Sequence, residues 1–280
     1  MVCDYEVLPP QHGEPLPELD ERVTFAFLLT LGAGLATGLG SLLGVMSRRF
    51  SPGLLTLALS FSAGVMLFIS FVEIFPKARQ ILTSALGSST GYLVAVLAFF
   101  GGMFAMAMVD RCLPAHGLPL QGVRSGESSS ALMRTGLFSA LAIAIHNFPE
   151  GLATFVAALS EPRLGAGIAL AIAIHTVPEG LAISAPIYYA TGSRRSAFLV
   201  SFVSGLAEPF GALAGYLFLG WLNNDLLLGL VFASVGGIMI YICLDELLPA
   251  AQRTGAKHNL MIGGVTAGMA VMSVSLLLLA

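Results

Sequence analysis

Charged side chains are scarce in this sequence. Asp, Glu, Lys and Arg make up 10% of its 280 residues, hydrophobic residues make up 56%, and the mean hydropathy is +0.87. A soluble domain carries about 25% charged residues, so the composition excludes a water-soluble enzyme. The formal net charge is only -3 and there is no basic tract, so we expect no nucleic-acid partner. The composition is that of a polytopic membrane protein.

Cysteine is also rare, and it carries no motif. Cys3, Cys112 and Cys243 show no CxxC spacing, which excludes a zinc ribbon and gives no sign of a disulfide framework. The long apolar segments are what the sequence has instead. Eight of them reach the length of about 20 residues that a membrane helix needs. The predicted spans are residues 23–46, 53–75, 91–110, 133–159, 164–187, 196–220, 225–248 and 260–280.

The positions of Lys and Arg predict the orientation, because cytoplasmic loops carry an excess of these residues. With the N-terminus outside, nine of the 13 fall in inward segments and four in outward segments. We therefore expect both termini to be extracytoplasmic, with residues 1–22 as an acidic tail and residues 23–280 as one membrane domain. Residues 111–132, rich in Gly and Ser, are expected to form a flexible cytosolic loop. No targeting peptide is recognised, so the cell membrane is the expected location.

The strongest internal signal is a duplicated motif. The segment LAIAIHNFPEGLA begins at Leu141 and recurs 29 residues later as LAIAIHTVPEGLA, with 11 of 13 positions identical. In each copy a His precedes a Glu by four residues, His146 before Glu150 and His175 before Glu179, which places each pair on one helix face. A proline between His and Glu removes a backbone donor and predicts a kink in both helices. Carbonyls freed in this way need protein or water partners, so the kinks indicate a polar cavity at mid-membrane.

A second repeat is fainter. Residues 64–76 (GVMLFISFVEIFP) match residues 237–249 (GIMIYICLDELLP) at five of 13 positions, including a Glu and the final Pro. The two segments lie in the second and seventh spans, which cross the membrane in opposite directions. Inverted repeats with a site at their interface are typical of secondary transporters.

Three carboxylates, Glu150, Glu179 and Glu208, lie well inside predicted spans. Each costs about 2.5–3.5 kcal/mol on insertion scales, so together they oppose insertion by roughly 8–10 kcal/mol. No Lys or Arg lies at comparable depth, whereas a bound cation would neutralise them. Imidazole with carboxylate suits zinc and related divalent metals, and two His–Glu pairs supply the four ligands that zinc prefers. The thioether of Met66, on a neighbouring span, is a candidate soft ligand.

Other candidates and other functions stay open at this point. Glu73 and Glu246 lie near the outer and inner ends of their spans, where interfacial solvation explains a carboxylate as well as an entrance or exit role does. An intramembrane metal-dependent hydrolase would need an open metal position and a general base. However, HExxH is absent and no Ser or Asp has an obvious catalytic partner, so we expect no enzyme. A proton channel or pump would use the same carboxylates without metal, but it leaves the duplicated His–Glu pairs unexplained.

HNFPEG at His146 and HTVPEG at His175 resemble the motifs of the ZIP (Zrt/Irt-like) metal transporters, in particular the bacterial zinc transporters. The resemblance continues in SAGVMLFISFVEIFP, SGLAEPFG and DELLP and covers essentially the whole chain after residue 22. It implies an all-α protein with eight transmembrane helices arranged as three, two and three, the outer triplets being inversely related. It also implies a metal site, often binuclear, between the fourth and fifth helices.

The resemblance further implies two metal positions that share the glutamates of both motifs. The ligands of the first would be His146, Glu150, His175 and Glu179, with Met66 nearby. Those of the second would be Asn147, Glu150, Glu179 and Glu208. Thr176 departs from the pattern, because the family usually has Asn or Asp there and Thr is a poorer ligand.

The expected function is uptake of divalent metal into the cytosol by alternating access around a midplane site. Metal would arrive near Glu73 and leave past Glu246. Zinc is the expected substrate, with iron, manganese, cobalt and cadmium as further transported ions, and no cofactor is expected. The other expected partners are the lipid bilayer and a second copy of the chain in a homodimer.

Overall fold

The computed structural model describes residues 19–46, 52–112, 129–218 and 225–279. Over these residues the chain is all-α, without a strand, and eight spans are long and apolar enough to cross a membrane. The predicted fold class is therefore confirmed. Most of the predicted acidic tail and the centre of the predicted cytosolic loop lie outside these ranges.

In order along the chain, the eight spans are a first three, a central two and a last three. The first three are α1 (Leu19–Met46), then α2 (Pro52–Ile69) with the π-helical turn η1 (Ser70–Ile74) and α3 (Phe75–Leu86), then α4 (Ser88–Cys112). The central two are α5 (Ser129–Ser160) and α6 (Pro162–Thr191). The last three are α7 (Arg194–Gly205) with α8 (Ala207–Leu217), then α10 (Asp225–Ile242) with the π-helical turn η2 (Cys243–Leu247) and α11 (Leu248–Arg253), then α12 (His258–Leu279).

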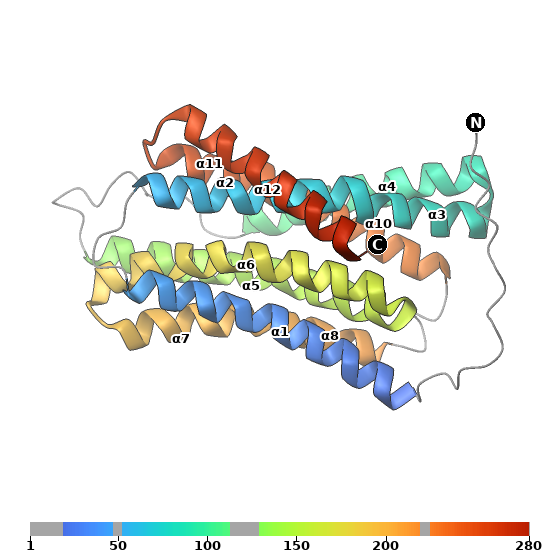
Figure 1. The fold of residues 1–280 in the computed structure, drawn as a ribbon, viewed down its shortest axis with the longest axis horizontal. Coiled ribbons are helices and arrows are strands. Elements are labelled where there is room, and N and C mark those ends of the chain that lie inside the picture. The colour runs from blue at the N-terminus through green and yellow to red at the C-terminus, as the bar shows by residue number, and fades with distance from the viewer. Residues whose placement is uncertain (1–18, 47–51, 113–128, 219–224, 280) are drawn as a thin grey trace.

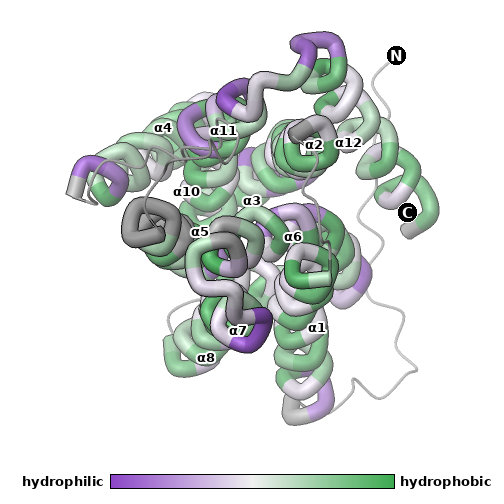
Figure 2. The backbone as a smooth tube through the Cα atoms, turned by 90° about the vertical axis from the view of Figure 1, so that its left-hand side faces the viewer, coloured by the Kyte–Doolittle hydropathy of each residue, from purple (hydrophilic) through white to green (hydrophobic). Residues whose placement is uncertain are grey.

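The helices form two layers (Figure 1). The α5–α6 layer consists of α1, α5, α6, α7 and α8, and the α2–α10 layer consists of the remaining helices. Within the first layer α1 packs along α6 and α5 along α8, and within the second α2 packs along α12 and α4 along α10. The layers meet where α2 packs on α6 and α10 on α5. Viewed along the helices, apolar residues cover most of each helix and the strongly hydrophilic segments lie at helix ends and turns (Figure 2).

Glycines make the closest helix contacts within each layer. A Cβ at Gly180 would collide with the backbone of α1, and one at Gly151 would collide with the backbone of α8. In the other layer Gly64 contacts the backbone of α12 in the same way, and Gly237 contacts that of α4. Small residues at such points let membrane helices approach closely and pack by van der Waals contact. Each layer is therefore tightly packed within itself.

The fainter repeat is visible in the backbone as a shared irregularity. The first N–H after each π-helical turn donates to the carbonyl five residues back, Phe75 to Ser70 and Leu248 to Cys243. A proline follows each of these residues directly. It has no N–H, and its ring clashes with the carbonyl four residues earlier in a regular helix, so a widened turn relieves that clash. The two turns occupy aligned positions of the repeat, in agreement with an inverted relation between the triplets.

Several helix ends differ from the prediction. The second span continues past residue 75 to Leu86, and the seventh continues past residue 248 to Arg253. Polar residues lower the hydropathy after residue 75, but Ala78 and Leu82 are buried at i, i+4 spacing and α3 packs along α10. An amphipathic face is enough to continue a helix. Because the prediction relied on apolar runs, its ends for these two spans were too early.

Helix also extends into segments that were expected to be irregular. α1 begins at Leu19, within the predicted tail. α4 ends at Cys112 and α5 begins at Ser129, so both ends of the predicted loop at residues 111–132 are helical. Helices that project beyond the hydrocarbon region need no apolar residues there, and hydropathy alone does not register them.

The sixth span is broken at Leu206, between α7 and α8. Pro209 lacks the N–H that would bond to the carbonyl of Gly205, and the N–H of Leu206 is shared between the carbonyls of Phe202 and Val203. By contrast, α5 and α6 continue as helices through their own prolines in the duplicated motif. A proline in a membrane helix is thus accommodated in three ways in this chain: by a π-helical turn, by a break, or by an unbroken helix.

Candidate functional site

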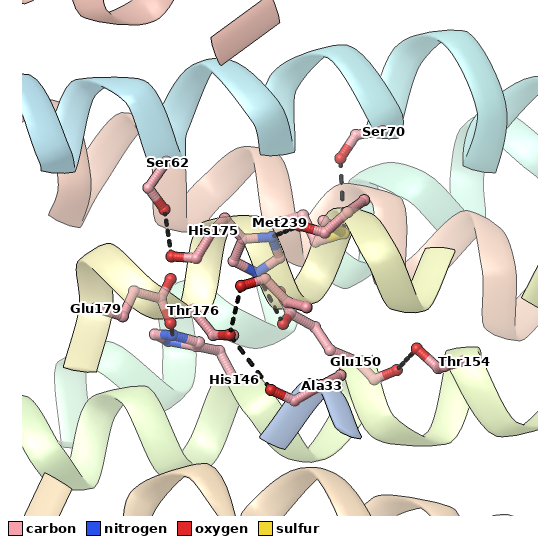
Figure 3. A network of polar contacts seen from close by, with 12 residues as sticks. Ala33, Ser62, Ser70, His146, Glu150, Thr154, His175, Thr176, Glu179 and Met239 are labelled. Carbon is pink, nitrogen blue, oxygen red and sulfur yellow. Dashed lines mark hydrogen bonds and ion pairs between the residues drawn. The ribbon is translucent and has the colours of Figure 1, made fainter. Parts of the chain in front are cut away.

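The two copies of the duplicated motif lie beside each other (Figure 3). They belong to α5 and α6, which are consecutive, joined by a short turn and packed along each other, so that the copies face head to tail. All of their polar side chains are at most 1% exposed. These residues are His146, Asn147, Glu150, His175, Thr176 and Glu179.

Each His pairs with the Glu of the other copy. Nε2 of His175 lies 3.2 Å from Oε2 of Glu150, and Nε2 of His146 lies 3.7 Å from Oε2 of Glu179 (Figure 3). The i, i+4 spacing places His and Glu of one copy on the same helix face, and antiparallel packing then brings the two faces together with the pairs crossed. The four side chains predicted as ligands therefore meet in one cluster, which we call the His–Glu cluster.

Backbone contacts fix the orientation of His175. Its Nδ1 lies 3.0 Å from the carbonyl of Ala171, which can only accept, so Nδ1 carries the proton. Nε2 is then the nitrogen that faces Glu150 and is available to a metal. The hydroxyl of Ser62, on α2, donates to the backbone carbonyl of His175 at 3.1 Å. His146 is less constrained, because neither of its ring nitrogens has a hydrogen-bond partner among the described residues.

Further buried polar atoms near the His–Glu cluster have no hydrogen-bond partner among the described residues. The backbone of Glu208 on α8 lies against Gly151, the residue after Glu150. Within the described part of the chain, neither carboxylate oxygen of Glu208 and neither amide atom of Asn147 has a hydrogen-bond partner. Leaving a buried polar group unpaired costs about 1–3 kcal/mol, and more for a charged group. A group of unpaired carboxylate and amide oxygens beside two imidazoles is chemically suited to a divalent cation.

Thr176 and Asn147 occupy equivalent motif positions but make different contacts. The hydroxyl of Thr176 lies 3.4 Å from the carbonyl of Ala33 on α1 and 3.4 Å from that of Ala173 on its own helix. This hydroxyl is therefore engaged in helix packing, whereas the amide of Asn147 is not.

Met66 lies in the opposite layer. It is completely buried on α2, one helical turn beyond Ser62, whose hydroxyl contacts the backbone of His175. Its counterpart in the fainter repeat is Met239, which is also buried and whose sulfur lies 3.7 Å from the hydroxyl of Ser70 (Figure 3). The sequence prediction included Met66 but not Met239, although the alignment of the repeats pairs them.

In this conformation Nε2 of His175 and Oε2 of Glu150 lie within hydrogen-bonding distance, whereas Nε2 of His146 and both carboxylate oxygens of Glu179 have no hydrogen-bond partner among the described residues. Among the residues that the structure describes, no group of three or more His, Cys, Asp or Glu is arranged to hold a metal ion. In the crossed contacts one oxygen of each carboxylate faces the Nε2 of an imidazole: Oε2 of Glu150 faces His175 and Oε2 of Glu179 faces His146. Binding a cation would exchange the two His–Glu contacts for contacts with the ion.

Glu73 and Glu246 lie on the two π-helical turns, outside the His–Glu cluster. Glu73 lines a cavity of about 500 Å³ between the layers, together with Lys77, Glu161 and Arg163. Nζ of Lys77 forms an ion pair with Oε2 of Glu161 at 2.7 Å across this cavity wall. Glu246 is half-buried, and one of its carboxylate oxygens has no partner among the described residues. Among the described residues, no ion pair links Glu73 or Glu246 to the His–Glu cluster.

No sequence pattern indicates three features of this region: the crossing of the His–Glu pairs, the Ser62–His175 contact and the Lys77–Glu161 ion pair. The last two join residues that are 113 and 84 positions apart. Contacts at such separation depend on how the helices pack, and no local spacing reports them.

Comparison with known proteins gives a consistent result. The family model described as "ZIP Zinc transporter" matches residues 120–276. The chain is 57% identical over 267 residues to the zinc transporter ZupT of Chlorobaculum parvum, covering 93% of this chain and 99% of that protein. It is 55% identical to ZupT of Chlorobium chlorochromatii, with the same coverage. For ZupT of Lysinibacillus sphaericus the identity is 51% over 269 residues, covering 93% of this chain and 100% of that protein.

Proposed function

We propose a transport mechanism from one premise: this chain belongs to the ZIP family of zinc transporters. It carries Zn²⁺ across a membrane, as the name of its relatives, zinc transporters, suggests. The direction that we propose is into the cytosol. The observation that carries the proposal is the His–Glu cluster, in which two imidazoles and two carboxylates are buried together within apolar helices. The family is one of transporters, and this favours a carrier over the hydrolase and the metal-free proton channel.

In this proposal the ion replaces the crossed contacts. His146, Glu150, His175 and Glu179 supply four ligands, the number that zinc prefers, and two of them are anionic and neutralise the dication. The proton on Nδ1 of His175 leaves Nε2 free to bind. Met66 adds a thioether from the opposite layer.

A second ion position lies beside the first, with Asn147 and Glu208 as its own ligands and Glu150 and Glu179 shared. The unpaired oxygens of Asn147 and Glu208 support it. The engagement of the Thr176 hydroxyl with Ala33 makes this position poorer in ligands than the family pattern. We therefore propose that it binds metal more weakly than the first.

The placement of the proposed ligands in the two layers supports alternating access. Except for Met66, every proposed ligand belongs to the α5–α6 layer. The close glycine contacts at Gly151, Gly180, Gly64 and Gly237 all lie within one layer or the other. Each layer is thus suited to move as a unit. In our mechanism the α5–α6 layer slides along α2 and α10 and carries the ion from the side of Glu73 to the side of Glu246.

Several finer points belong to the same proposal. The excess of Lys and Arg in inward segments supports extracytoplasmic termini, and the cell membrane is the proposed location. Iron, manganese, cobalt and cadmium are proposed as further substrates, because imidazole and carboxylate ligands also suit related divalent metals. The homodimer stays a prediction that mass determination in a lipid nanodisc would test.

The test is uptake of radioactive zinc into proteoliposomes that contain the purified protein. We expect saturable accumulation that excess unlabelled zinc abolishes and that iron, manganese, cobalt and cadmium reduce to different degrees. A proton channel would instead acidify the vesicles without accumulating zinc. A hydrolase would neither acidify the vesicles nor accumulate zinc. Vesicles that do not accumulate zinc, whether or not they acidify, would therefore refute the proposal.

A further inference from the structure

Among the described residues, two polar contacts between the layers join α6 or its N-terminus to the second span. One is the hydrogen bond from Ser62 on α2 to the carbonyl of His175. The other is the ion pair between Lys77 on α3 and Glu161, the residue that precedes α6. The ion pair lies on the wall of the cavity that also contains Glu73. Sliding of one layer past the other would break both contacts.

The inverted repeat predicts which side chains take the place of these contacts after such a movement. When the alignment of residues 64–76 with 237–249 is extended by two residues at its start and one at its end, Ser62 corresponds to Val235 of α10, and Lys77 corresponds to Ala250 of α11. Both counterparts are buried and apolar. Neither can donate a hydrogen bond from its side chain or form an ion pair. The neighbouring pair Ala78 and Ala251 supports the alignment, because both are buried alanines.

In a transporter built from inverted repeats, the opposite-facing state arises when the two halves exchange their arrangements around the site. α10 would then contact α5 as α2 contacts α6 here. Val235 would face the backbone of α5 in place of Ser62, and Ala250 would stand in place of Lys77. That state would lack both polar contacts.

We propose that the Ser62–His175 hydrogen bond and the Lys77–Glu161 ion pair form a one-sided latch. The latch favours the conformation described here over its opposite-facing counterpart. This inference rests on the proposed transport cycle and extends it, because it assigns an unequal equilibrium to the two states. The strength of the latch is modest. An ion pair whose side chains are 32% and 50% exposed shifts an equilibrium only about two- to fivefold, and a single hydrogen bond shifts it by a similar factor.

The test measures the distance between the layers directly, by pulsed electron resonance between two spin labels on the full-length protein in lipid. One label replaces exposed Leu97 on α4 and the other replaces exposed Leu217 on α8, with Cys3 and Cys112 changed to Ser. A second pair of labels, at Leu97 and Leu277 of the same layer, reports any distortion within that layer. No metal is needed, so failure of zinc uptake and failure of the latch are seen separately.

We expect Ser62→Ala and Lys77→Met each to lower the ratio of the described state to the other state about two- to fivefold. The double variant should lower it about tenfold, because the two contacts share no residue and their effects add in free energy. The charge exchange Lys77→Glu with Glu161→Lys should restore most of the ratio lost in Lys77→Met. Val235→Ser should shift the ratio in the opposite direction by supplying the missing donor.

Arg79→Met is the matched control. Arg79 is a basic residue on the same helix, but it lies over the ring of Tyr92 on α4, within its own layer. Its replacement should leave the ratio unchanged. An unchanged ratio in both Ser62→Ala and Lys77→Met would overturn the proposal. So would an equal shift in Arg79→Met, or a charge exchange that restores nothing.

Discussion

At the scale of single residues, the site depends on side chains that are costly to bury. Glu150 and Glu179 are at most 1% exposed and have only the imidazole of the opposite copy as ion-pair partner among the described residues. A carboxylate in that setting is stabilised by a cation far more than by a neutral neighbour. The neutral amide of the same shape should therefore be tolerated by the fold but not by metal binding.

Glu150→Gln and Glu179→Gln should each reduce zinc uptake at least about 100-fold, since loss of even an outer partner of a ligand costs up to that factor. Removing a buried charge should not destabilise the fold, so both variants should elute as the native protein in detergent. The measurement is initial uptake in proteoliposomes. The control is Asp225→Asn, which neutralises an exposed carboxylate at the start of α10. This variant should transport normally. Normal uptake by either Gln variant would remove that glutamate from the site.

Substitutions of Thr176 test whether the second ion position exists. Thr176→Asn should strengthen that position, because an amide oxygen is a better ligand than a hydroxyl that is engaged with Ala33. Calorimetric titration with zinc should then show a larger amount bound per protein at high affinity. Thr176→Ala, which removes the hydroxyl without adding a ligand, should leave the stoichiometry as in the unmodified protein. An unchanged stoichiometry in Thr176→Asn would argue against a second position.

At the scale of helices, close packing of α1 on α6 holds the second motif in place. Gly180 and Gly40 bring the two backbones together, and a Cβ at Gly40 would collide with the backbone of Val177, three residues before Gly180. The π-helical turns act differently, since they place Glu73 and Glu246 where a regular helix would aim other residues.

Gly40→Leu should lower the free energy of unfolding by about 3 kcal/mol, the upper part of the range for overpacking, because a backbone cannot move aside as a side chain can. Thermal unfolding in detergent, followed by loss of the monodisperse peak, measures the effect. Gly32→Leu lies on the same helix, where a Cβ meets nothing within 4 Å, and it should unfold like the unmodified protein. Equal stability of the two variants would contradict the packing described here.

At the scale of the whole molecule, the direction of transport depends on which side each end of the helices faces. The predicted orientation places Cys3 outside and Cys112 at the inner end of α4. Cys243 is completely buried. The chain therefore carries its own probes of topology.

A membrane-impermeant maleimide applied to intact cells should label the protein, and Cys3→Ser should abolish most of that labelling. Cys112→Ser should leave it unchanged, and labelling of Cys112 should require permeabilised cells. Gel-shift detection with a polyethylene glycol maleimide gives the number of labelled thiols. Labelling of intact cells that persists in Cys3→Ser and disappears in Cys112→Ser would reverse the proposed orientation.

The fold class and the eight spans were predictable from the sequence, and so were the four residues that the structure brings together in the His–Glu cluster. Each of these follows from local information: a span is a run of apolar residues, and the spacing of His146 and Glu150 fixes a helix face. The inverted relation between the second and seventh spans was also predictable from the sequence, because Glu73 and Glu246 occur with their prolines at aligned positions. Span ends were less accurate, since the helix beyond residue 75 persists through the buried face of Ala78 and Leu82 rather than through hydropathy.

The packing of the helices sets which of these groups meet. His175 pairs with Glu150 of the other copy rather than with Glu179 of its own, because side chains four apart on one helix stack along it, whereas antiparallel packing brings opposite partners into contact. The division into two layers, and the contacts of Ser62 and Lys77 that join them, likewise depend on distances between segments far apart in the chain. Periodicity and spacing predict which residues share a face of one helix. Which helices contact each other depends on how their surfaces pack.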